Sequence, residues 1–158
     1  MTEKIGILGL GRMGGTAARL LLANGQKVFA VDRPSTRWLL DAGGKLVVSP
    51  KVLGETANIL LVLLAREEDV EQAIFGSQGL AEAKNKGLIV ADMGTFGVAL
   101  KERIYNALMP SGVLVLDAPI SGTPDAMETK RAVIMASGDE NACEMIRPVL
   151  EVLASKYS

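Results

Sequence analysis

Short, continuously apolar segments alternate with longer amphipathic ones along the chain, and this alternation limits the fold more than any other feature of the sequence. Residues 59–64 are all Ile, Leu or Val, which is typical of a strand covered on both faces. The predicted strands are residues 4–9, 27–32, 45–48, 58–64, 87–92, 112–117 and 132–137. The predicted helices are residues 13–23, 35–42, 50–56, 67–75, 96–109 and 139–153, the last kinked or divided at Pro148.

The order of these segments predicts the α/β fold class. Repeated strand–helix units form right-handed crossovers, so we expect a doubly wound, mostly parallel sheet with helices on both faces. The chain has 158 residues, of which 49% are hydrophobic, and it contains no evident linker. A single domain over residues 1–158 is therefore expected.

The composition excludes several classes of function. The chain has no histidine and one cysteine, so it can hold no Ser-His-Asp triad, no histidine-bound metal and no internal disulfide, and we expect no metal site. A formal net charge of −1 argues against a nucleic-acid partner. The longest apolar run, residues 59–65, is far shorter than the roughly 20 residues that cross a bilayer. Without a signal-like N-terminus, the sequence predicts no membrane partner and a cytoplasmic location.

A glycine-rich loop follows the first predicted strand and opens the first predicted helix. It fits the pattern G-x-G-x-x-G, and Asp32 ends the next strand at the distance where this motif places an acidic residue. The first glycine permits a tight turn, the second lets the backbone approach a pyrophosphate, and the third lets helix and strand pack closely. The same loop could be an ordinary turn of a flavodoxin-like domain. We favour a Rossmann-type dinucleotide site formed by Gly9, Leu10, Gly11, Arg12, Met13 and Gly14.

The residues after the second strand bear on the choice of cofactor. Asp32 can accept hydrogen bonds from the adenosine ribose and repels a 2′-phosphate, which favours NAD. Arg33, with Ser35, Thr36 and Arg37 nearby, could instead hold that phosphate, or could cover the adenine or be solvated. We expect NAD as the cofactor, with NADP as the alternative.

Three further loops should converge on the same edge of the sheet, because parallel strands all end there. Residues 64–69, 92–95 and 117–123 follow the fourth, fifth and sixth predicted strands. Small or hydroxylated residues in them leave room for a ligand. Thr95 could also cap the next helix, and residues 121–123 could be a plain turn or a carboxylate site built from N–H groups and hydroxyls.

The glycine loop, the segment 92–95 and the run D-A-P-I-S-G at residues 117–122 together resemble the β-hydroxyacid dehydrogenase family. That family includes 3-hydroxyisobutyrate and 6-phosphogluconate dehydrogenases and, more distantly, the imine reductases. The resemblance implies an N-terminal NAD(P)-binding domain, and a C-terminal helical domain, absent from this chain, that forms the homodimer. The family's catalytic lysine would lie beyond residue 158, so no catalytic residue is expected here, and Lys101, Lys130 and Lys156 are expected to be solvated.

The resemblance also assigns roles to individual positions. The cofactor would be lined by Leu64, Ala65, Asp69 and Thr95, the last near the nicotinamide ribose. The substrate carboxylate would be held by Ser121, Gly122 and Thr123. The family usually has proline where Ala65 stands and glycine where Thr123 stands.

We therefore predict the cofactor-binding domain of an NAD(P)-dependent oxidoreductase that acts on a small 2- or 3-hydroxy acid. The chain alone should be inactive. The alternatives are a non-catalytic dinucleotide-binding or assembly module, and an imine reductase-like enzyme.

Overall fold

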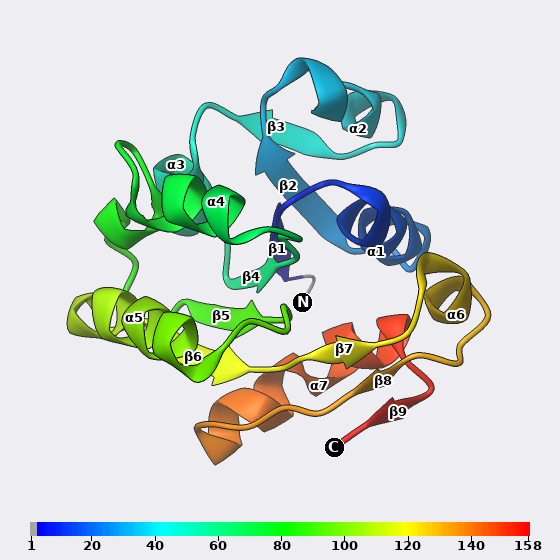
Figure 1. The fold of residues 1–158 in the computed structure, drawn as a ribbon. Coiled ribbons are helices and arrows are strands. Elements are labelled where there is room, and N and C mark those ends of the chain that lie inside the picture. The colour runs from blue at the N-terminus through cyan, green and yellow to red at the C-terminus, as the bar shows by residue number, and fades with distance from the viewer. Residues whose placement is uncertain (1–2) are drawn as a thin grey trace.

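The computed structural model describes residues 3–158 and contains a six-stranded parallel sheet (Figure 1). Its strand order is β3-β2-β1-β4-β5-β6, and all neighbouring strands run parallel. The strands are β1 (Lys4–Leu8), β2 (Lys27–Val31), β3 (Lys45–Val47), β4 (Ile59–Val62), β5 (Ile89–Asp92) and β6 (Leu114–Asp117). The predicted Rossmann-type sheet is confirmed, and its order reverses between β1 and β4.

Helices cover both faces of this sheet, as expected. On one face lie α1 (Arg12–Ala23), α6 (Pro124–Glu128) and α7 (Glu140–Leu153). On the other lie α3 (Pro50–Thr56), α4 (Glu67–Val70) and α5 (Val98–Leu108), while α2 (Trp38–Asp41) precedes β3. Shorter helical turns are η1 (Pro34–Thr36), η2 (Glu71–Phe75), η3 (Leu80–Glu82) and η4 (Met109–Ser111). The segment predicted as one helix over residues 67–75 is thus α4 followed by a π-helical turn.

Strand β4 explains why the sheet needs two helical layers. Its successive side chains point to opposite faces. Ile59 and Leu61 belong to the core under α1 and α7, whereas Leu60 and Val62 belong to the core under α3 and α5. All four are buried, with no more than 2% of any of these residues exposed. The apolar run therefore fixes a strand in the middle of the molecule.

The last predicted strand, residues 132–137, does not join the main sheet. Only β8 (Val133–Ile134) is extended, and it forms a small separate sheet with β7 (Ile120–Ser121) and β9 (Lys156–Tyr157). The chain turns back through α6, so β8 pairs antiparallel with β7 and cannot continue the parallel order beyond β6. Residue Ser137 still bridges Asp117 in the antiparallel direction.

Helix α7 is not divided at Pro148, where the sequence predicted either a kink or a division. Ile146 precedes the proline, and Val149, Leu150 and Leu153 follow it, all buried in the core. Because both halves are held by this packing, the loss of one backbone hydrogen bond does not end the helix. None of the helices within residues 3–158 is long and apolar enough to span a membrane.

Candidate functional site

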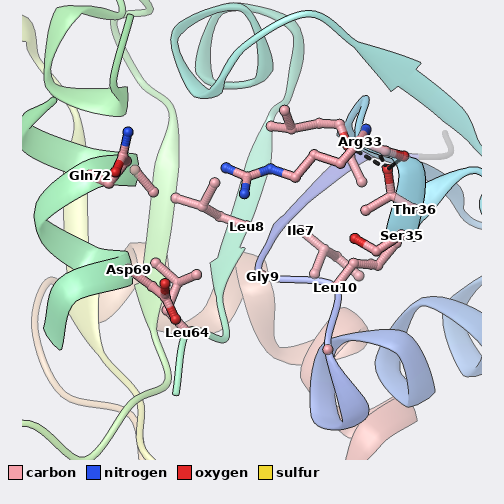
Figure 2. A pocket seen from close by; sticks show the side chains of 14 residues that line it. Ile7, Leu8, Gly9, Leu10, Arg33, Ser35, Thr36, Leu64, Asp69 and Gln72 are labelled. Atoms are coloured by element: carbon pink, nitrogen blue, oxygen red, sulfur yellow. Dashed lines mark hydrogen bonds between the residues drawn. The ribbon is translucent and has the colours of Figure 1, made fainter. Parts of the chain in front are cut away.

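A cavity of about 500 Å³ opens where the strand order reverses, at the carboxyl ends of β1, β2 and β4 (Figure 2). Open parallel sheets bind their ligands at this position, and the volume suits a small organic molecule or cofactor. The lining residues are Ile7, Leu8, Gly9, Leu10, Gly11, Ala30, Val31, Arg33, Ser35, Thr36, Leu64, Asp69, Gln72 and Ala73.

The glycine loop forms one wall of this cavity. Gly9 has φ +102°, and a Cβ there would lie 2.6 Å from the carbonyl oxygen of Leu63. A Cβ at Gly14 would lie 1.7 Å from the carbonyl oxygen of Gly9, so α1 can approach β1 only with glycine at this position. At Gly11, by contrast, a Cβ would meet no atom of residues 3–158 within 4 Å. Packing within the protein therefore explains Gly9 and Gly14 but leaves Gly11 facing open space.

The N-terminus of α1 follows this open space. Gly11 is the N-cap residue, and none of the side chains in residues 3–158 caps this end of the helix. Its first N–H groups and partial positive charge are the features that bind anions at helix N-termini. Arg12, Met13 and Gly14 belong to this first turn and do not line the cavity itself.

The loop after β2 forms a second wall. Arg33 lines the cavity and extends toward Leu8 (Figure 2). Its backbone N–H donates to Thr36 Oγ1 at 2.9 Å, and that hydroxyl donates to the carbonyl of Val31 at 2.7 Å, which fixes the turn. Asp32 is not among the lining residues: its Oδ1 lies 2.9 Å from Nε of Arg37, at the exposed rim.

The loop after β4 and the helix that follows complete the cavity. Leu64 and Asp69, which are predicted to contact the cofactor, line this cavity, whereas Ala65 is exposed and does not. Gln72 and Ala73 also line it, and the sequence analysis missed them. Their spacing of three and four residues after Asp69 places them on the same helical face, which is the signal that could have found them.

A second group of polar residues lies at the ends of β5 and β6. Lys101 Nζ is 2.6 Å from Asp117 Oδ1, 3.4 Å from Asp92 Oδ2 and 2.7 Å from the carbonyl oxygen of Gly94. The expectation of a solvated Lys101 is wrong, because only 17% of its side chain is exposed. Burial raises the pKa of the Asp92 carboxyl, and the charge of Lys101 opposes that rise. Sequence spacing gave no sign of this cluster.

Thr95 lies in the exposed loop between Gly94 and α5 and does not line the cavity. The alternative role as a helix cap is wrong, because α5 begins at Val98 with Gly97 as its N-cap. Thr95 therefore does not cap α5.

The predicted carboxylate loop is exposed and apart from the cavity. Ser121 belongs to β7, and Gly122 has φ +139°, a conformation that favours glycine. Thr123 caps α6, where its Oγ1 accepts the backbone N–H of Ala126 at 3.1 Å. The Thr123 hydroxyl hydrogen is still able to donate.

Comparisons with known proteins agree with this geometry. The family described as "NAD binding domain of 6-phosphogluconate dehydrogenase" matches residues 4–158. The chain is 34% identical over 158 residues to an L-threonate dehydrogenase of Cupriavidus necator, covering 99% of this chain and 53% of that protein. It thus spans about half the length of such relatives.

Solved structures give the same result. A 3-hydroxyisobutyrate dehydrogenase of Mycobacterium tuberculosis, determined with L-serine, superimposes with a TM-score of 0.88 at 28% identity, covering 100% of this chain and 54% of that one. Psf3 in complex with NADP+ and 2-OPP gives a TM-score of 0.89 at 28% identity, covering 98% and 55%.

Proposed function

Because the chain belongs to the family of the NAD-binding domain of 6-phosphogluconate dehydrogenase, we propose that its 500 Å³ cavity binds a nicotinamide dinucleotide for an oxidoreductase of small 2- or 3-hydroxy acids. The observation that carries this proposal is the open space in front of Gly11. Within the part of the chain that the structure describes, no neighbouring atom requires glycine there, and the space in front of it adjoins the uncapped N-terminus of α1. That combination suits a pyrophosphate, which needs both close backbone approach and N–H donors.

The residues divide the dinucleotide between them. The pyrophosphate would lie against Gly9–Gly14 and the adenosine against Arg33 and Ser35, with Leu64 and Asp69 opposite. When bound, the nicotinamide supplies the site that accepts or gives a hydride.

NAD and NADP should differ little in affinity. The carboxylate of Asp32 disfavours a 2′-phosphate, but its charge is paired with Arg37, and the charged side chain that lines the cavity on this side is Arg33. We propose that NAD is the cofactor and that NADP is also accepted, with dissociation constants within about tenfold of each other.

The substrate would be a hydroxy acid whose carboxylate binds Ser121, Gly122 and Thr123. L-threonate and 3-hydroxyisobutyrate dehydrogenases, named among the relatives, act on molecules of this class. Lys101 Nζ already donates to three acceptors, the carbonyl oxygens of Asp92 and Gly94 and Asp117 Oδ1, so we do not assign it as the base. We propose that the base and the homodimer contacts lie in the half of the relatives' length that this chain does not cover.

Calorimetric titration of the chain with NADH and NADPH tests the proposal. Gly11→Ala is the decisive variant, because its methyl group enters open space and should leave the melting temperature unchanged. By intruding on the pyrophosphate it should weaken binding about tenfold or more, the loss expected when a charged group loses a hydrogen bond. Folded wild-type protein that binds neither nucleotide would refute the proposal.

A further inference from the structure

We propose that Lys101 is a positioning residue: it holds the peptide group between Gly94 and Thr95 and joins that loop to the end of β6, so that the nicotinamide side of the site is shaped before a dinucleotide binds. This inference rests on the proposed function. The inference concerns the geometry at the carboxyl ends of β5 and β6. The shape of the cavity at β1, β2 and β4 does not determine that geometry.

The contacts of Lys101 leave its ammonium little freedom. The residue lies in the first turn of α5, and its Nζ donates to the carbonyl oxygen of Gly94 at 2.7 Å and to Asp117 Oδ1 at 2.6 Å. It also lies 3.4 Å from both the carbonyl oxygen and Oδ2 of Asp92. An ammonium has three hydrogens to donate. Acceptors from β5, from the loop and from β6 therefore surround the ammonium.

The bond to Gly94 controls the direction of the next N–H. In a trans peptide the C=O and the following N–H point in opposite directions within one plane. With the Gly94 oxygen held by Lys101, the N–H of Thr95 must point away from the ammonium. Thr95 is the residue expected beside the nicotinamide ribose. Lys101 thus sets the orientation of a polar group that it does not touch.

The loop is compact on its other side as well. The ring of Phe96 folds over Gly94, where a Cβ would lie 2.6 Å from ring atom Cε2. The N–H of Gly94 donates to Asp92 Oδ1 at 3.2 Å. Because both the N–H and the carbonyl oxygen of Gly94 are hydrogen-bonded, the loop has few alternative conformations.

The same ammonium reaches the strand that leads to the predicted substrate loop. Asp117 ends β6, and three residues later the chain enters β7, which contains Ser121. Backbone bonds reinforce the junction: Ala118 N–H donates to the carbonyl of Asp92 at 2.8 Å. Lys101 therefore connects the loop expected to contact the cofactor with the segment expected to hold the substrate.

A purely structural role must be separated from this positioning role. Asp92 is 2% exposed and its Oδ2 has no hydrogen-bond partner within residues 3–158, so its charge depends on the nearby ammonium. Lys101→Met removes the ammonium and leaves that carboxylate buried. The double variant Asp92→Asn/Lys101→Met removes both charges and keeps the amide oxygen for Gly94.

The test is a titration of the 158-residue chain with NADH and, separately, with ADP, which reports on the adenosine half alone. Lys101→Met should weaken NADH binding about tenfold, the loss expected for a misplaced hydrogen-bond partner, and should change ADP binding by less than about twofold. The double variant should regain thermal stability but not NADH affinity. Lys84→Met, an exposed lysine, controls for the lost positive charge.

Three outcomes of this titration would overturn the inference. If the double variant regains NADH affinity, Lys101 acts only by neutralising Asp92. Equal losses of NADH and ADP affinity would mean that the whole fold is affected. An unchanged NADH affinity in Lys101→Met would also refute it.

A second measurement works without any nucleotide. Hydrogen exchange at the Gly94 N–H should quicken about tenfold in both Lys101→Met and the double variant, because the loop loses its anchor. If wild-type protein binds no nucleotide, the proposed function fails, and this exchange rate alone decides the role of Lys101: an unaltered rate rejects it.

Discussion

The two halves of the binding edge are shaped by opposite means. Around β1, β2 and β4, the structure depends on missing side chains: Gly14 allows α1 to approach Gly9, and Gly11 leaves the cavity open. Around β5 and β6, it depends on a long charged side chain, Lys101, that fills the space between two carboxylates and a carbonyl. Steric exclusion does not respond to pH, whereas a buried ion cluster does. The two halves should therefore fail under different conditions.

The largest effect is expected for Gly14→Ala. The new Cβ would lie 1.7 Å from the carbonyl oxygen of Gly9, so α1 or β1 must shift. We expect a loss of stability of about 4 kcal/mol or more, at the exceptional end of single substitutions. Denaturant unfolding at several pH values measures it, and the loss should be independent of pH. A stability like that of Gly11→Ala would contradict the steric argument.

A smaller and pH-dependent effect is expected for Lys101→Met. Breaking a buried ion pair costs about 3 kcal/mol near neutral pH, because the Asp92 carboxylate is left without its cation. Burial already raises the pKa of Asp92, and loss of the lysine should raise it further. A raised pKa in the folded state means that stability is recovered as pH falls through that pKa.

The loss of stability in Lys101→Met should therefore be greatest at the alkaline end of the pH range and shrink toward the acidic end. Unfolding curves across this range measure the trend. Asp92→Asn/Lys101→Met is the control and should show no such trend. A loss of stability that is constant with pH would mean that packing, and not charge, shapes this half of the site, as it does in the glycine loop.

The smallest effect on stability is expected for Arg33→Ala. This variant compares the removal of Arg33 with the removal of the other cation, Lys101. Arg33 lines the open cavity and forms none of the ion pairs found in residues 3–158, in contrast to Lys101. Its removal should change stability by less than about 0.5 kcal/mol. It should weaken NADPH binding about tenfold and NADH binding much less, since only NADPH carries the 2′-phosphate. Equal losses for both nucleotides would assign Arg33 to the adenine instead.

The sequence was informative wherever local chemistry decides the structure. The apolar run at residues 59–64 and the turn and packing roles of Gly9 and Gly14 depend on neighbours in the chain, and these predictions are confirmed in the sheet and in the loop. The approach of Gly11 to a pyrophosphate stays a prediction. Of the predicted cofactor residues, the cavity brings together Gly9, Leu10, Gly11, Arg33, Leu64 and Asp69.

The features that the sequence did not predict depend on contacts between residues that lie far apart in the chain. Residues 133–134 have the composition of a core strand, but their partner is set by the turn through α6. Lys101 has the spacing of a solvated helix residue, yet its partners Asp92 and Asp117 are 9 and 16 positions away. Such contacts depend on which strand ends meet at the sheet edge, and residue spacing alone does not give that information.

The small sheet of β7, β8 and β9 links the segment that contains Ser121 to residues 156–158 through hydrogen bonds. Strand β8 is bonded on one side to β7, where Val133 pairs with Ser121, and on the other to β9, where it pairs with Lys156. Beyond it, Ala136 N–H donates to the carbonyl of Ser158 at 2.7 Å. Hydrogen-bonded strands move in register, so a pull or twist applied at residues 156–158 is carried across β8 to Ser121. Strain can thus travel between residues 156–158 and the predicted substrate loop, and the bridge between Ser137 and Asp117 joins the same segment to β6 of the main sheet.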